Sequence, residues 1–162
     1  MGNNINIKKI NWKKLLLSIL LTQGAGGIGA IATTPKIVSW YVTLNKPTFN
    51  PPNWLFGPVW TLLFLMMGVA FYLVWMEGKK AYGALKIFGL QLGLNVLWSF
   101  LFFGAESPGL ALLEIVFLWL AILATIISFQ KISKTAMWLM IPYLGWVSFA
   151  SVLNGAIYWL NK

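Results

Sequence analysis

Residues 40–60 read WYVTLNKPTFNPPNWLFGPVW and separate two long apolar segments. They contain four of the seven prolines and three of the ten tryptophans in the chain. Because proline fixes φ and biases the preceding residue toward extended backbone, no regular helix is expected before about Asn53. Tryptophan and tyrosine rings suit the membrane–water boundary. We therefore predict a semi-rigid, ring-rich loop over the mouth of a helical bundle, although composition fits a plain interfacial belt equally well.

The composition indicates an integral membrane protein. The 162 residues are 59% hydrophobic and only 9% charged, with a mean hydropathy of +0.78, which fits no ordinary soluble domain. An apolar helix of ~20 residues crosses the hydrocarbon core of a bilayer. We expect one all-α domain over residues 1–162, a bundle of five transmembrane helices with a long, Pro- and Trp-rich first loop.

The residues that are missing exclude several classes of site. The sequence has no cysteine and no histidine, which excludes disulfides, Ser-His or Cys-His catalytic pairs, zinc sites and His-ligated haem. We expect no required cofactor and no metal site. The lysines lie at the ends of the apolar segments rather than on one face, so nucleic acid is not an expected partner.

Five spans are expected, at about residues 12–32, 54–76, 84–103, 108–129 and 134–160. Ser107 and Pro108 resemble the N-cap and first residue of a helix, and Pro58 is a candidate first residue of the second span. The first segment also resembles a secretory signal peptide, with a basic flank and a small-residue site at Ala30–Ala32. Its length and glycines favour a helix that stays attached.

The lysine distribution predicts the orientation in the membrane. Five spans put nine of the twelve lysines on the side of the N-terminus and three, Lys36, Lys46 and Lys162, on the other. The positive-inside rule then places the N-terminus in the cytoplasm and the first loop outside.

Polar residues inside the spans are costly and need a partner or a function. Gln91, Asn95 and Ser99 share one helical face, and Trp98 flanks it. Trp146, Ala150 and Asn154 repeat that spacing in the last span. Two interpretations stay open: hydrogen bonds that hold the helices together, or an aromatic-lined cavity for a flat apolar ligand.

Three motifs resemble those of a known family. They are the residues 40–60 quoted above, QLGLNVLW at 91–98 followed by FFGA at 102–105, and PYLGW at 142–146 continuing to Asn154. In this order they resemble the TspO/MBR family of tryptophan-rich sensory proteins and translocator proteins, also called peripheral benzodiazepine receptors. The resemblance covers roughly residues 30–159.

The resemblance implies a five-helix bundle, usually a homodimer, with one ligand cavity under the first loop. The implied ligands are porphyrins including haem, sterol-like lipids, and synthetic isoquinolines or benzodiazepines. Some members are proposed to degrade protoporphyrin in light, through tryptophans that resemble Trp60 and Trp146. Binding and sensing of tetrapyrroles, with transport as an extension, and light-dependent porphyrin oxidation therefore both stay open. Carried across by position, the pocket comprises Tyr41, Phe56, Gly57, Trp60, Asn95, Trp98, Trp146, Ala150 and Leu153.

The chain departs from the vertebrate members in ways that favour a bacterial one. Leu110 stands where vertebrate members have a tryptophan at the start of the fourth helix. Gly155 and Trp159 replace the tyrosine and arginine of the vertebrate cholesterol motif, which puts sterol binding in doubt. These differences, with the termini rich in Lys, Asn and Ile, predict a bacterial cell membrane protein rather than a mitochondrial one.

Overall fold

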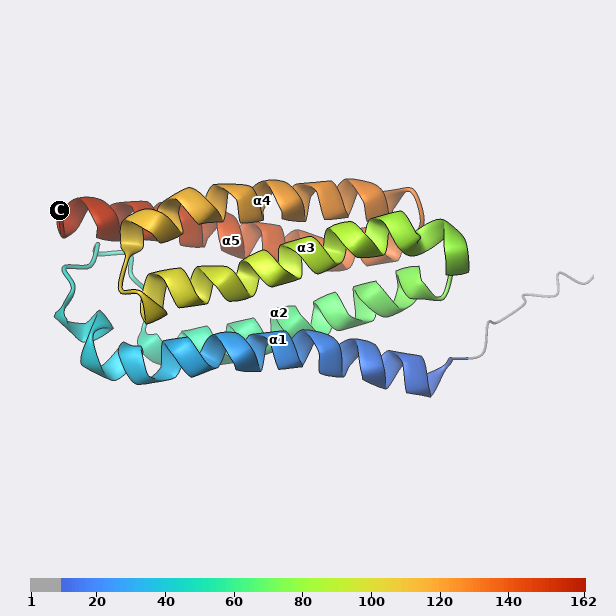
Figure 1. The fold of residues 1–162 in the computed structure, drawn as a ribbon, viewed down its shortest axis with the longest axis horizontal. Coiled ribbons are helices and arrows are strands. Elements are labelled where there is room, and N and C mark those ends of the chain that lie inside the picture. Colours follow the sequence, from blue (N-terminus) through green and yellow to red (C-terminus); the bar gives the residue numbers. More distant parts are fainter. Residues whose placement is uncertain (1–9) are drawn as a thin grey trace, which may run out of the picture.

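The computed structural model describes residues 10–162, and this part of the chain is a bundle of long helices (Figure 1). All five long helices are apolar enough to cross a membrane, which confirms the predicted all-α, five-helix membrane fold. The long helices are α1 Trp12–Ser39, α2 Asn53–Trp75, α3 Tyr82–Ser99, α4 Pro108–Gln130 and α5 Lys134–Leu160. Short helical segments are η1 Tyr41–Thr43, η2 Gly78–Ala81 and the π-helical η3 Phe100–Gly104.

Side-chain caps fix where several of these helices begin. The Ser107 hydroxyl accepts a hydrogen bond from the Leu110 amide, and Pro108 is the first residue of α4, as expected. The Ser133 hydroxyl caps α5 by accepting from the Ala136 amide at 3.2 Å. Such caps satisfy backbone amides that have no partner within the helix.

The predicted end of α1 was wrong, whereas the start of α2 agrees with the predicted span but not with Pro58 as its first residue. α1 does not end near Ala32 but continues through Pro35 to Ser39, whose hydroxyl donates to the Pro35 carbonyl at 2.8 Å. α2 begins at Asn53, directly after the Pro51-Pro52 pair, so Pro58 lies inside the helix rather than at its start. The restricted backbone of residues 51–52 sets this boundary.

The helices run antiparallel to their neighbours in sequence, and this sorts the lysines to the two ends (Figure 1). The "loop end" holds residues 40–52 and the C-terminus, together with Lys36, Lys46 and Lys162. The opposite, "lysine-rich" end holds the start of α1 and the turns that follow α2 and α4. Within the described chain it carries Lys13, Lys14, Lys79, Lys80, Lys86, Lys131 and Lys134.

The main core lies among α2, α3, α4 and α5, toward the lysine-rich end. Phe88 and Phe129 are fully buried and stack with their ring centroids 5.8 Å apart. α1 packs on this core through α2: a Cβ added to Gly68 would lie 2.9 Å from the Ile19 Cα. Only glycine permits this approach, so α1 and α2 are in close contact in this half of the bundle.

Candidate functional site

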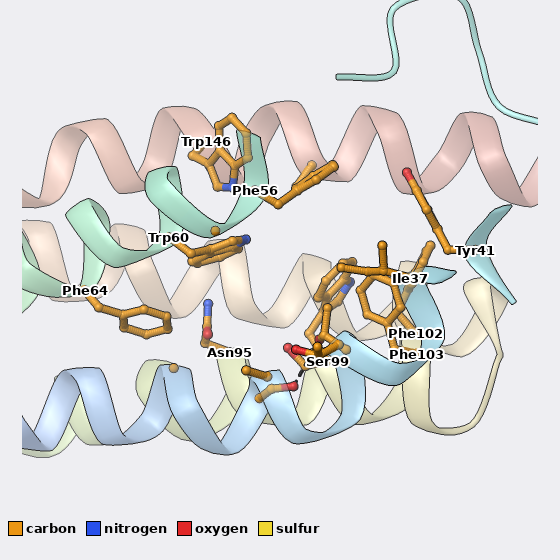
Figure 2. A pocket seen from close by; sticks show the side chains of 18 of the residues that line it. Ile37, Tyr41, Phe56, Trp60, Phe64, Asn95, Ser99, Phe102, Phe103 and Trp146 are labelled. Atoms are coloured by element: carbon orange, nitrogen blue, oxygen red, sulfur yellow. Dashed lines mark hydrogen bonds between the residues drawn. The ribbon is translucent and has the colours of Figure 1, made fainter. Parts of the chain in front are cut away.

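A cavity of about 410 Å³ lies among α1, α2, α3 and α5. All nine residues that the sequence predicted for the pocket line it: Tyr41, Phe56, Gly57, Trp60, Asn95, Trp98, Trp146, Ala150 and Leu153. Figure 2 shows how the labelled side chains from different helices point into one space. The carried-over positions, more than 100 residues apart in the chain, therefore meet at a single site.

Aromatic rings form much of the cavity wall. Trp60 and Trp146 meet edge to face with ring centroids 6.5 Å apart, and Phe56 packs on Trp146 at 6.1 Å. Such edge-to-face contacts fix ring orientation. Both Trp60 and Trp146 line the cavity, and neither indole N–H has a hydrogen-bond partner in the described chain. The wall therefore offers two unused donors to a hydrogen-bond acceptor on a ligand.

The polar residues of the cavity also hold the helices together. The Trp98 indole donates to the Asn154 side-chain oxygen at 3.1 Å, and the Asn154 amide donates to the Pro108 carbonyl at 2.8 Å. The Asn95 amide donates to the Tyr143 hydroxyl at 2.9 Å. Because Asn95, Trp98 and Asn154 also line the cavity, the two interpretations of these residues are compatible: the same bonds join helices and orient the wall.

Sequence reasoning missed the wall that α1 contributes. The cavity-lining residues of α1 are Gln23, Gly26, Gly27, Gly29, Ala30, Thr33, Thr34 and Ile37. Part of the α1 glycines serve close helix packing: a Cβ on Gly26 would lie 2.6 Å from the Phe64 ring. The small residues recur every three or four positions, and this spacing was the available signal for a wall facing the other helices.

The π-helical segment at the end of α3 was also missed as part of the site. The Ala105 amide donates to the Phe100 carbonyl at 2.7 Å, five residues back. One such wide turn adds a residue to the helical repeat and is frequent at functional sites. Phe102 and Phe103 of this segment line the cavity, and Phe102 stacks on Trp98 with ring centroids 5.0 Å apart.

Hydrogen bonds within the first loop hold its residues around a buried tyrosine. The Tyr41 side chain is 3% exposed, and its hydroxyl donates to the Asn50 side-chain oxygen at 2.6 Å. Burial raises the pKa of Tyr41 to about 12. The Lys46 ammonium donates to the Tyr41 and Leu44 carbonyls at 2.8 and 2.7 Å. The proline-rich loop is therefore held in one conformation by side-chain bonds as well as by its prolines.

The same loop is joined to the end of α5. The Asn45 amide donates to the Asn161 side-chain oxygen, and the Asn161 side-chain amide donates to the Asn45 carbonyl, both at 2.9 Å. Phe49 also packs edge to face on Phe149. The C-terminal residues thus tie the loop to the bundle.

No charged side chain lines the cavity, and the described residues contain no cluster of metal-ligating side chains. Leu110 is 55% exposed and lies outside the lining. Glu114 is buried in α4, also outside the lining, and its carboxylate oxygens have no hydrogen-bond partner among the described residues. The cavity therefore provides ring faces, amides and hydroxyls.

Comparison with known proteins agrees with the motifs. The family model of the TspO/MBR family matches residues 18–160. The chain belongs to the TspO/MBR family. It is 45% identical over 153 residues to the tryptophan-rich protein TspO of Archaeoglobus fulgidus, covering 94% of this chain and 99% of that protein. It is 47% identical over 156 residues to that of Chlorobaculum tepidum, covering 91% and 98%.

Animal relatives are similar as well. The chain is 39% identical over 123 residues to the human translocator protein, covering 74% of this chain and 73% of that protein. As a TspO/MBR protein with five membrane-spanning helices, it is an integral membrane protein of a family of sensory and translocator proteins, in contact with the lipid bilayer.

Proposed function

We propose that this TspO/MBR protein binds tetrapyrroles, protoporphyrin and haem among them, in the cavity beneath the first loop, and acts as a membrane sensor that can pass them on. The observation that carries the proposal is the convergence of Trp60, Trp98 and Trp146 on one uncharged cavity. Its volume of about 410 Å³ lies within the range of ~300–1,000 Å³ typical of small-molecule sites.

The chemistry of the wall suits a flat aromatic ring. Ring faces and edges pack well against a planar apolar molecule, and the free indole N–H groups of Trp60 and Trp146 can donate to an acceptor at its rim. The chain offers haem no histidine or cysteine as an axial ligand. Ligation of the iron by either residue therefore cannot favour haem over metal-free protoporphyrin. Sterol-like lipids and synthetic isoquinolines or benzodiazepines are further candidate ligands on the family resemblance.

A second candidate function is light-dependent porphyrin oxidation. The contact between Trp60 and Trp146, at 6.5 Å between ring centroids and with both N–H groups free, favours it over other enzyme activities. In this proposal the two indoles are redox partners of the excited porphyrin, and no metal is required.

One titration separates the two functions. Purified protein in lipid nanodiscs is titrated with protoporphyrin IX in the dark and then illuminated. Saturable binding with an unchanged absorption spectrum under light supports the sensor. A new chromophore that forms only in light and is lost in Trp60→Phe and Trp146→Phe supports the enzyme. Absence of saturable binding in the dark refutes the proposal.

The arrangement in the membrane follows from the lysines and from the outer surface of α3. We propose a bacterial cell membrane, with the N-terminus and the lysine-rich end in the cytoplasm and the first loop outside. A homodimer is proposed as well: Gly89 and Gly93, at a spacing common in helix association, are exposed, and a Cβ at either would meet no atom within 4 Å.

A further inference from the structure

The edges at which α1 and α2 face each other carry small and polar residues that line the cavity. On each edge they recur every four or seven positions, so they follow one side of their helix. We call these two edges together the seam: Gln23, Gly27 and Thr34 on α1, and Asn53, Gly57 and Thr61 on α2. All except Gln23 are also exposed.

The seam is closed toward the lysine-rich end. The Gln23 side chain donates to the Thr61 carbonyl at 2.9 Å, and the Thr22 hydroxyl donates to the Phe64 carbonyl at 2.8 Å. These bonds between α1 and α2, together with the tight packing of Gly26 on Phe64, leave no passage there.

Toward the loop end the seam is open. A Cβ added to Gly27 or to Gly57 would meet no atom within 4 Å, although both residues line the cavity. Gly27 lies near the middle of the 28-residue α1, at a depth that a membrane-spanning helix places in hydrocarbon. The surface beside it is apolar, since Ile28 is 51% and Ile31 is 70% exposed. The opening therefore faces lipid chains rather than water.

In contrast to the seam, the direct route into the cavity from the loop end is closed by hydrogen bonds. Tyr41 is bonded to Asn50, and Asn45 is bonded to Asn161, so a ligand entering there would have to break these contacts. On the loop side of the Gln23–Thr61 contact, the described seam residues form no hydrogen bond between α1 and α2. A ligand that passes through the seam there therefore breaks none.

From these observations we infer that the cavity exchanges its ligand sideways with the bilayer, through the seam between α1 and α2. The inference rests on the proposed function and narrows it. The ligand class consists of molecules that first dissolve in the hydrocarbon region, such as uncharged or weakly amphipathic flat rings, and the protein samples their concentration in the membrane rather than in water.

Two matched phenylalanine variants test the inference. Gly27→Phe fills the open seam, whereas Gly24→Phe adds the same ring to an exposed glycine of α1 that is outside the cavity lining and has equally open surroundings. The rates at which protoporphyrin IX associates and dissociates are measured by stopped-flow fluorescence in lipid nanodiscs. For Gly27→Phe we expect both rate constants to fall by roughly tenfold, as for a narrowed gate, and for Gly24→Phe neither to change.

The outcomes are distinct. Unchanged rates in Gly27→Phe, or a changed affinity without slower association, would overturn the seam as the route while leaving the proposed function intact. Lack of saturable binding by the unaltered protein would instead refute the proposed function. Should Gly27→Phe fail to fold, as judged by its ligand-free melting temperature, Thr34→Phe places a ring in the same opening and carries the same expectation.

Discussion

Replacement of Ala150 by leucine tests whether the cavity holds the ligand. Ala150 lies one helical turn from both Trp146 and Asn154 on α5, and all three residues line the cavity. Its small side chain leaves space between two larger ones, into which a flat ring can slide. Leucine would fill this space with three additional carbon atoms.

The expected size of the effect follows from the cost of overfilling. Extra carbon atoms in a well-packed site typically cost ~1–3 kcal/mol. If that cost falls on the bound ligand, the affinity for protoporphyrin IX decreases by roughly 5- to 150-fold. Because Ala150 lines the cavity, the added carbon atoms can extend into it, and the ligand-free melting temperature should change little.

The assay measures both quantities on the same preparation. Ala156→Leu is the control, since Ala156 is a half-buried alanine of the same helix outside the cavity lining; it should leave the affinity unchanged. An unchanged affinity and a clearly lowered melting temperature for Ala150→Leu would refute the reasoning. Ala150 would then pack against a neighbouring helix, and this face of α5 would not belong to the site.

Three further predictions concern the loop and the metal. Asn161→Ala removes both hydrogen bonds to the Asn45 backbone, which are worth roughly 1 kcal/mol together at an exposed site. The rate of hydrogen exchange in residues 44–50 should therefore rise about fivefold. Asn45→Ala keeps those two bonds and should have a smaller effect, and equal effects of the two variants would contradict the role of Asn161 in holding the loop. Burial in the folded protein raises the pKa of Tyr41 to about 12. Between pH ~10 and ~12 the Tyr41 hydroxyl therefore keeps its proton in the folded protein but loses it in the unfolded chain, which favours unfolding. The melting temperature of the protein should therefore fall more between pH ~10 and ~12 than that of Tyr41→Phe, and parallel curves would disprove this. Metal-free protoporphyrin should bind at least as tightly as haem, and a strong six-coordinate haem spectrum with far tighter affinity would count against an unligated ring.

The sequence predicted the fold well because the membrane restricts it strongly. Hydrocarbon leaves the backbone of an isolated span no alternative to a helix, so five apolar segments gave five helices. The prolines at 51 and 52 located the start of α2 correctly. Pro35 was less informative: α1 continues through it, because a proline in a long membrane helix can be accommodated by neighbouring groups.

The residues of the candidate site were predictable only where a polar side chain is costly to place in hydrocarbon or where a residue belongs to a distinctive motif. Asn95 and Asn154 stood out because amides in hydrocarbon need partners, and the tryptophans stood out through the motifs. The wall formed by α1 did not, because its glycines and threonines are equally suited to helix packing. In a membrane, moreover, lipid-facing and core-facing sides are similarly apolar, so the hydrophobic pattern does not tell which side of α1 faces inward.

The cavity and its seam depend on how the helices pack against one another, which no single segment encodes. Gly24 and Gly27 are both exposed, and both have open space around them, yet only Gly27 lines the cavity. The surroundings of α2 differ in the same way: a Cβ on Gly68 would lie 2.9 Å from the Ile19 Cα, whereas a Cβ on Gly57 would meet no atom within 4 Å. A small residue in one helix is thus part of a wall, a passage or a lipid-facing surface according to the distance of its neighbour. In this protein α1 and α2 are held together at Thr22 and Gln23, whose side chains donate to the Phe64 and Thr61 carbonyls, and the open glycines lie on the loop side of these bonds.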